Sequence, residues 1–392
     1  MGSFRLWRFL CLCVPLLFRS FLSSNAQPIL GTKRIPSQSL SYKSLIENMF
    51  SRFPSGLKSE DMVTPRDPQA YQFNSGYLSI KNNTVEKYIF NDKPSPRHLG
   101  LLQLVMDVLE RYEIPDIRVE VNQKDRGDVF PIAGWVTWGS NRPALLFPNP
   151  RFGAMEFPWI HQSEAPWEML RLSNSSLEWA RGKRGFTTWE ADMALIREIN
   201  ANVDYLSKRS KAFFMGLPHR GPRKEFFEHA GYKRNLYEAI IPAHPLHGFA
   251  EFSAEASRLE RRFPGWVRHH YVGMQHWAMH RCVIHIHGES ASDRLRFLLA
   301  LNATVIWVHP QAYQEFWYPS LRPWVHYLPA RDLDDLDQKA AFCANNVTKA
   351  MEIARNGMKF VNDHLQYEQV LEYFAVVLRK YANLYGVHSN KT

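Results

Sequence analysis

Apolar and polar positions along the chain follow two different periods. Residues 98–114, "HLGLLQLVMDVLERYEI", have the apolar spacing of a helix, and "IRVEV" at 117–121 has the character of a strand. Further strand-like runs, each followed by a turn or a helix start, lie at 211–216, 282–288, 304–310 and 324–330. Strands that alternate with helices in this way predict an α/β protein with a parallel sheet and crossover helices.

The remaining stretches are less regular. A helical pattern returns at about 188–208 and over roughly the last fifty residues, whereas residues 27–70 follow neither period and predict an irregular lead-in. A chain of 392 residues, 45% of them apolar, can bury a large core and should form about two domains.

The first 26 residues have the pattern of an export signal. Arg5 and Arg8 precede the apolar run "FLCLCVPLLF", and the small-residue site Ser24-Asn25-Ala26 follows it. The apolar run is short for a bilayer span, so a cleaved signal is favoured over an uncleaved anchor. Passage through the secretory pathway also fits five N-x-Ser/Thr sequons, which begin at Asn82, Asn174, Asn302, Asn346 and Asn390.

Charge and cysteine content narrow the function classes. The net charge of +10 is a mild excess without a Lys/Arg run, which argues against a nucleic-acid partner. Cys11 and Cys13 would leave with a cleaved signal. Cys282 and Cys343 would remain, either paired in an oxidising lumen or both present as buried thiols.

Candidate chemistry first appears at "HIHGESASDRLR", residues 285–296. A strand ends near Gly288, and Ser290, Ser292 and Asp293 are typical N-cap residues before an apolar helix. Free amides at a helix start favour an anion, and Arg294, expected one turn into the helix, could bind a phosphate. An ordinary capped helix with a solvated arginine is the competing interpretation.

A second segment repeats this design. "FFMGLPHRGPRKEF" also passes from a strand through a glycine, Gly216, to a basic stretch with Arg220, Arg223 and Lys224. The carboxyl ends of parallel strands meet at one edge of the sheet, where ligands bind. Two such edges that face one another would enclose a diphosphate.

Several segments together resemble a known family, the capsule-associated glycosyltransferases, which include the Rumi-type protein O-glucosyltransferases of the endoplasmic reticulum. The segments are "IHG", "SDRLR", "TVIWV", "EFWYPSL" and "PWVHYLPARDLDDL". The resemblance covers roughly residues 115–380 and is strongest in its last third. It implies two Rossmann-like α/β domains that face a cleft, the GT-B type of glycosyltransferase fold.

The resemblance also implies an activity: inverting transfer of a hexose or pentose from a UDP-sugar to a hydroxyl of a protein or glycan. Glucose and xylose are the sugars that the resemblance favours. The UDP-sugar is a co-substrate; no cofactor and no metal are expected, because basic side chains and helix dipoles replace the cation. The expected compartment is the lumen of the endoplasmic reticulum or Golgi. The expected partners are the donor and the acceptor, with membrane contact only through an N-terminal anchor and no nucleic acid.

The expected domain organisation follows the chain in order. Residues 1–26 form the signal peptide or anchor and 27–70 the lead-in. Residues 71–187 form the N-terminal domain that presents acceptor and base. Residues 188–360 form the C-terminal domain that binds the nucleotide sugar, and 361–392 form helices that cross back.

Site residues are carried over from the family motif. Donor binding falls on Arg223, seven residues after Gly216, and on the turn that comprises Gly288, Glu289, Ser290, Ala291, Ser292, Asp293 and Arg294. Further donor or acceptor contacts are expected from Asn122, Gly216, Trp167, His287 and Glu315. Trp167 is either part of an interdomain core or a wall that stacks sugars.

Catalysis is assigned to Asp125. The family's Asn-x-x-Asp segment resembles "VNQKD", with Asn122 and Asp125, and the aspartate would accept the proton of the acceptor hydroxyl. The competing interpretations are that Asp125 is a turn residue and that Asp128 is the base.

Three positions depart from the family pattern. The two Arg-Gly pairs of the donor site read Met215-Gly216 and His287-Gly288 here, and the proline expected after the catalytic aspartate is absent. Arg220 or a charged His287 could compensate for the lost cations. Otherwise the chain is a divergent member that binds nucleotide sugar or glycan without turnover.

Histidine pairs also suggest a metal, which we do not predict. His276 and His280 in "HWAMH" have the spacing of one helix face, but Trp277 stands where a zincin has glutamate and no third ligand follows at a defined spacing. His285 and His287 share one face of a strand, which by geometry alone allows a ligand pair.

Overall fold

The computed structural model describes the chain in segments, within which all structural statements below are made. These are 43–51, 75–90, 96–122, 133–134, 137–138, 145–153, 155–156, 186–187, 189–218, 221–242, 250–268, 273–288 and 292–389. They belong to one compact unit, Ile35–Thr392, which is distinct from Met1–Arg34. The signal or anchor segment, Asp125, Asp128, Trp167, Arg220 and residues 289–291 lie outside the described segments.

The first sheet is mixed. Its strand order is β2-β1-β3-β4-β6, with β1 antiparallel to β2 and β3, and with β3, β4 and β6 parallel. The strands are β1 (Ser75–Lys81), β2 (Thr84–Phe90), β3 (Ile117–Asn122), β4 (Ala133–Gly134) and β6 (Leu145–Leu146). Helix α3 (Pro96–Arg111) buries Leu104, Val105 and Val108, which have the i, i+1, i+4 spacing of one helix face.

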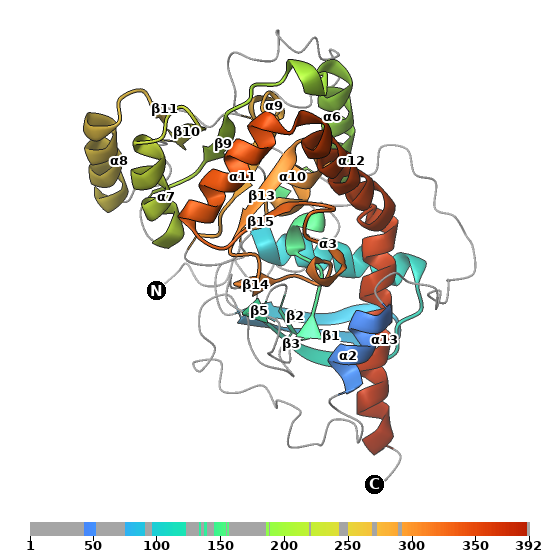
Figure 1. Cartoon of the computed structure of the whole chain (residues 1–392). Coiled ribbons are helices and arrows are strands. Elements are labelled where there is room, and N and C mark those ends of the chain that lie inside the picture. Colours follow the sequence, from blue (N-terminus) through green and yellow to red (C-terminus); the bar gives the residue numbers. More distant parts are fainter. Residues whose placement is uncertain are drawn as a thin grey trace. The chain divides into compact units, whose positions relative to one another are not determined.

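The second sheet is parallel throughout and carries the candidate chemistry. Its order is β11-β10-β9-β12-β13-β15. Figure 1 labels β9, β10, β11, β13 and β15 of this sheet. The strands are β9 (Ala212–Met215), β10 (Tyr237–Pro242), β11 (Val267–Arg268), β12 (Cys282–His285), β13 (Thr304–Val308) and β15 (Leu328–Ala330). Every residue of β9, β12 and β13 is buried, which is why these strands are nearly continuous apolar runs.

Helices connect the parallel strands and extend beyond them. They are α6 (Trp189–Asn202), α7 (Gly221–Gly231), α8 (Ala250–Arg262), α9 (Met274–Ala278), α10 (Leu295–Ala300), α11 (Leu333–Asn345), α12 (Val347–His364) and α13 (Tyr367–Ser389). Short 3-10 turns are η2 (Pro150–Phe152), η4 (Tyr205–Ser207) and η5 (Tyr318–Ser320). Two small antiparallel pairs join β5 (Thr137–Trp138) to β14 (Tyr313–Gln314) and β7 (Met155–Glu156) to β8 (Phe186–Thr187).

These elements confirm the predicted α/β class and its parallel sheet with crossover helices. Two local predictions were wrong. The helix expected at 188–208 ends at Asn202, because Asp204 caps the separate turn η4 by accepting the N–H groups of Leu206 and Ser207. The lead-in expected to be irregular contains α2 (Lys43–Ser51), where Ile46 is buried and Met49 and Phe50 pack on the core at helical spacing.

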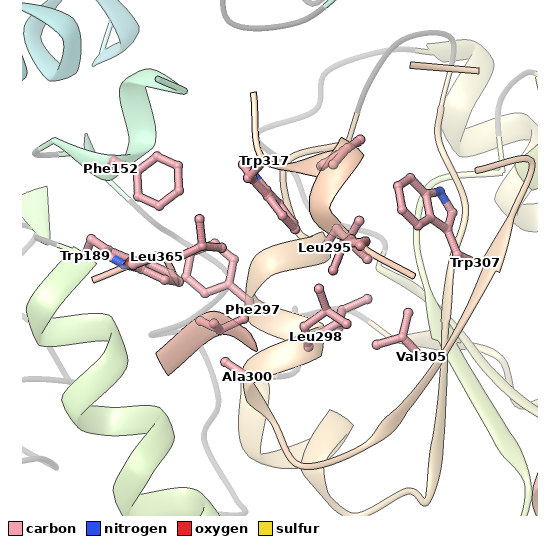
Figure 2. Packing of buried hydrophobic residues seen from close by; sticks show 14 of the residues in the cluster. Phe152, Trp189, Leu295, Phe297, Leu298, Ala300, Val305, Trp307, Trp317 and Leu365 are labelled. Atoms are coloured by element: carbon pink, nitrogen blue, oxygen red, sulfur yellow. The ribbon is translucent and has the colours of Figure 1, made fainter. Parts of the chain in front are cut away.

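Aromatic rings around α10 build much of the core. Phe297 contacts Trp189 edge to face at a centroid distance of 5.2 Å, and Trp189 contacts Phe152 at 5.3 Å (Figure 2). The Trp189 indole N–H donates to the Leu365 carbonyl, so the polar atom of this buried ring is satisfied.

Helix α13 contacts the first sheet although it follows the second in sequence. The Tyr373 hydroxyl donates to the Leu146 carbonyl at 2.7 Å, and the Tyr112 hydroxyl of the α3 end donates to Glu368 at 3.0 Å. The domain boundaries given above remain predictions. No helix in the described segments is both long enough and apolar enough to span a bilayer.

A disulfide links the parallel sheet to α11. Cys282 at the start of β12 is bonded to Cys343, 61 residues later, and both residues are completely buried. Of the two alternatives left open by the sequence, pairing is the one observed. The bond closes a long loop and therefore restricts the unfolded chain.

Replacing both cysteines by alanine should lower the free energy of unfolding by about 4 kcal/mol, the value expected for closure of a loop of this length. Urea unfolding of wild type and of the Cys282→Ala/Cys343→Ala variant measures the difference. Wild type in a thiol reductant is the control and should lose a similar amount. Equal midpoints for oxidised and reduced wild type would contradict the prediction.

Candidate nucleotide-diphosphate site

The two glycine junctions predicted from the sequence lie at the same edge of the parallel sheet. Strands β9 and β12 are neighbours, with Val283 opposite Phe213, so their carboxyl ends are adjacent. Gly216 directly follows β9, and Gly288 follows β12 by three residues. The sequence therefore brings together the two segments expected to enclose a diphosphate.

Arg223 connects these two strand ends. It lies in the first turn of α7, the helix after β9, and its Nε donates to the carbonyl of Ile286 beyond the end of β12 at 3.2 Å. Its guanidinium also covers Gly288: a Cβ built on that glycine would lie 3.4 Å from the Arg223 Cζ. The arginine of one junction is thus held by the backbone of the other.

Arg294 makes the opposite connection. Its Nη1 donates to the carbonyl of Met215 at the end of β9 at 2.5 Å, and its Nε donates to the Ser292 hydroxyl at 3.2 Å. The guanidinium stacks near the rings of Phe214 and Trp277, each 5.5 Å away. Arg223 and Arg294 therefore form a reciprocal pair, which we call the arginine pair.

The start of α10 differs from the prediction. The helix begins at Leu295, with Arg294 itself as the N-cap residue and without a side-chain cap, whereas Arg294 was expected one turn inside a helix capped by serine or aspartate. Ser292 instead accepts from Arg294, and its backbone N–H is used by His287. The positive charge consequently lies at the strand end and not along the helix.

Lack of space explains the glycine at 216. A Cβ there would lie 2.8 Å from the Phe214 ring, which is itself packed between Phe226 and Phe227. Neither Gly216 nor Gly288 has a positive φ, so the left-handed conformation does not explain them. Side-chain bulk is excluded at the first junction because the backbone passes close to a fixed ring.

His287 is a neutral hydrogen-bond acceptor in this site. Its Nδ1 accepts from the Ser292 backbone N–H at 3.1 Å, which ties Ser292, just before α10, to the segment that follows β12. Burial, reinforced by the charges of Arg223 and Arg294, lowers the pKa of His287 to about 3. The imidazole therefore does not replace a lost family cation. Arg220, the other residue suggested for that role, lies outside the described segments.

Glu315 and Arg296 lie behind the strand ends, inside the core. Glu315 is 1% exposed and accepts from the Trp317 indole and from the Tyr318 hydroxyl, both at 3.2 Å. Arg296 is equally buried, with its guanidinium 4.2 Å from the centroid of Phe152. Glu315 was expected to contact a ligand, but its carboxylate is occupied by its own neighbours.

The other predicted residues are placed only in part. Asn122 is the last residue of β3. Asp293 is partly exposed between Ser292 and Arg294. Asp125, Trp167 and Glu289–Ala291 lie outside the described segments.

Sequence reasoning assigned no role to Arg296, the second basic residue of "SDRLR". Its i+2 spacing from Arg294 directs it into the core, where Phe152, Trp189 and Phe297 face its guanidinium. The sequence signal for its burial was that Arg296 lies within the apolar run "RLRFLLAL".

Chemically, the edge presents two guanidinium groups and a hydroxyl next to two glycine backbones. A guanidinium carries several N–H donors in a fixed plane and matches the oxygen atoms of phosphate. Because a carbonyl fixes each arginine of the pair, an anion that binds here meets donors that are already oriented.

The family model of glycosyl transferase family 90 matches residues 165–392, more than half of the chain. The chain belongs to glycosyl transferase family 90. The resemblance inferred from the sequence motifs is thereby confirmed. The match includes the arginine pair and every strand of the parallel sheet.

Two relatives show the range of similarity. Protein O-glucosyltransferase 2 of Danio rerio is 31% identical over 322 residues, which cover 79% of this chain and 55% of the relative. Protein O-glucosyltransferase 1 of Mus musculus is 24% identical over 396 residues, which cover 96% of this chain and 91% of the relative. The chain spans about half the length of the first relatives it matches, including a rumi homolog of Aedes aegypti at 48%.

Among solved structures, Anabaena Alr3699/HepE in complex with UDP-glucose is similar at a TM-score of 0.36 and 14% identity. The alignment covers 50% of this chain and 54% of that one.

The buried carboxyl of Glu315 should make stability depend on pH. Burial raises its pKa to about 7, opposed by the charge of Arg296 and reinforced by Asp293. The unfolded chain has a glutamate pKa of about 4.3, so between these values the folded state binds more protons and stability falls as pH rises. Relative to Glu315→Gln, wild type should lose about 1 to 3 kcal/mol between pH 5 and pH 8.

Urea unfolding of both proteins across this pH range measures the effect. The glutamine does not titrate; its one oxygen can accept from the Trp317 indole, and its amide N–H can donate to the Tyr318 hydroxyl oxygen. If the free energy of unfolding changes with pH in the same way for both proteins, Glu315 does not change its protonation in this range.

Proposed function

We propose that this chain is an inverting glycosyltransferase that moves a sugar from a UDP-sugar donor to a hydroxyl of a protein or glycan. Glucose or xylose is the proposed sugar. The observation that carries the proposal is the arginine pair at the carboxyl edge of the parallel sheet, in a chain that belongs to glycosyl transferase family 90. The relatives named protein O-glucosyltransferase support glucose as the first sugar to test.

In the proposed reaction the donor's diphosphate binds at Arg223, Arg294 and the turn from Gly288. The acceptor oxygen forms a bond to the sugar carbon, and the bond from that carbon to the phosphate oxygen breaks. UDP leaves with the electron pair, stabilised by guanidinium groups whose positions are fixed before the reaction. These cations take the place of a metal ion at the diphosphate.

Asp125 is the proposed base. It follows Asn122, the last residue of β3, by three positions and would take the proton of the acceptor hydroxyl as the new bond forms. A single displacement without a covalent glycosyl-enzyme inverts the sugar carbon, so an α-linked donor gives a β-linked product.

We further propose that the protein works in the lumen of the endoplasmic reticulum or Golgi. The disulfide Cys282–Cys343 supports an oxidising compartment. The sequon residues Asn82 and Asn346 are exposed, as glycan attachment requires. A basic and apolar N-terminal segment adds a signal peptide or anchor to this proposal.

A non-catalytic member of the family is the second candidate. It is favoured by Met215 and by the neutral His287, which stand where the family has arginines and supply no charge to a leaving diphosphate. Such a protein would bind UDP but release none from a donor. A panel of UDP-sugars assayed for UDP release separates the two candidates.

Replacing Arg294 by alanine should weaken UDP binding by about 1.5 to 3 kcal/mol, as expected for a lost hydrogen bond to a charged group. Calorimetry with UDP measures the loss, and a thermal melt verifies that the variant is folded. Arg281→Ala is the matched control, because Arg281 also binds a carbonyl, that of Leu206, but at the amino end of β12. Unchanged affinity in a folded Arg294→Ala variant would refute the diphosphate site.

Replacing Asp125 by asparagine should reduce turnover roughly 10²- to 10⁴-fold, because the amide cannot accept the acceptor's proton. UDP affinity should remain at the wild-type value, since the arginine pair is untouched. Transfer rates and the product anomer, determined by NMR, are compared for wild type and variant. Transfer at the wild-type rate would assign the base elsewhere, Asp128 first, and retention of the α-anomer would exclude single displacement.

A further inference from the structure

A second cluster of polar side chains lies at the opposite, amino edge of the parallel sheet. Glu238 is the second residue of β10, and His280 lies two residues before β12. His276 projects from α9. Together these three side chains offer one ligand atom each, all within 4.8 Å of one another.

Hydrogen bonds of His280 leave one contact in this cluster without a donor between its two atoms. Its Nδ1 lies 3.0 Å from the carbonyl oxygen of His276, which can only accept, so Nδ1 carries the proton. In the neutral ring Nε2 is then a lone pair, and it faces Glu238 Oε2 at 3.1 Å. Two acceptors at this separation repel each other unless a positive charge lies between them.

His276 completes the arrangement. Its Nε2 is buried, lies 3.4 Å from Glu238 Oε1 and makes no hydrogen bond within the described part of the chain. The two imidazoles approach different oxygens of the same carboxylate, at 3.4 Å for His276 and 3.1 Å for His280. One ligand atom from each residue lies within 4.8 Å of the others, so a small shift of the side chains would bring all three to the 2.0 to 2.1 Å bonds of one ion.

We propose that Glu238, His276 and His280 bind a zinc ion. Two imidazoles and one carboxylate are a ligand set that suits zinc, whereas calcium and magnesium prefer oxygen alone. The prediction of no metal was made from sequence spacing, and the third ligand could not be found that way because Glu238 precedes His280 by 42 residues.

The neighbours of the cluster fit a metal site. Phe213 stacks on the His280 ring at 4.5 Å and lies 4.9 Å from the His276 ring, which fixes both imidazoles and excludes water from one side. Arg209 donates to both Glu238 oxygens, at 3.0 and 3.3 Å, and so orients the carboxylate from outside. The Glu238 side chain is 30% exposed, which provides a path for the ion.

The proposed zinc has a structural role. It would join β10, α9 and the start of β12 at the edge opposite the arginine pair. It is therefore separate from the proposed sugar transfer, which needs no metal at the diphosphate.

The test uses the full chain, dialysed against a weak chelator. Wild type should retain a single zinc ion per chain by elemental analysis. Its thermal midpoint should fall with EDTA and recover with ZnCl2, because a ligand that binds only the folded state stabilises it. Cobalt chloride added to the metal-free protein should give the visible absorption of a tetrahedral Co²⁺ site.

Two variants distinguish the ligands from their surroundings. His276→Gln should weaken zinc binding at least about a hundredfold, more than is typical for loss of a residue that only supports a ligand. His229→Gln is the matched control and should keep the zinc, because His229 also faces a carboxylate, Asp337 at 2.8 Å, but without a second histidine. UDP affinity should be unchanged in both variants.

The Glu238→Gln variant separates loss of zinc binding from loss of folding. The glutamine amide can donate a hydrogen bond to His280 Nε2, so the variant should fold without metal and bind no zinc. Its thermal midpoint should not change with EDTA. If wild type contains no zinc and neither EDTA nor ZnCl2 moves its midpoint, a proton closes the cluster and the proposal is wrong. Zinc retained by both His276→Gln and Glu238→Gln would place the ion elsewhere and also overturn it.

Discussion

The arginine pair is the interaction on which the rest of the candidate site depends. Arg223, from the helix after β9, binds the backbone beyond β12, and Arg294, from the turn after β12, binds the backbone at the end of β9. Backbone carbonyls beyond the last ladder bond need a donor, and the two guanidiniums supply it. Satisfying these carbonyls fixes two positive charges at one sheet edge, so the same bonds serve stability and anion binding.

Burial and the arginine pair together keep His287 neutral. Burial lowers the pKa of the imidazole most, the two guanidiniums lower it further, and the neutral ring accepts the Ser292 N–H. A protonated ring would place an N–H group against the Ser292 N–H and lose this hydrogen bond. Where the family pattern has an arginine, this chain therefore has a neutral ring that holds Ser292, just before α10, near the end of β12.

Sequence reasoning was strongest where a local pattern has one structural solution. The buried runs "AFFM", "CVIH" and "TVIWV" became central parallel strands, since their apolar character suits burial on both faces. The approach of the two glycine junctions depends on β9 lying beside β12, a strand order that the sequence did not predict. The orientation of Arg294, the burial of Glu315 and the meeting of Glu238 with two histidines depend on tertiary packing, which no short-range period encodes.

Helix α9 and strand β9 join the two edges of the sheet. Trp277 stands between His276 and His280 in sequence, and its ring packs on Phe213 at 4.8 Å and beneath the Arg294 guanidinium at 5.5 Å. Phe214, the next residue of β9, supports the same guanidinium from its own side. Trp277 of α9 and Phe214 of β9 thus hold the Arg294 guanidinium from two sides, while His276 of the same helix and Phe213 of the same strand belong to the cluster at the amino edge. One helix and one strand therefore contribute side chains to both edges of the sheet.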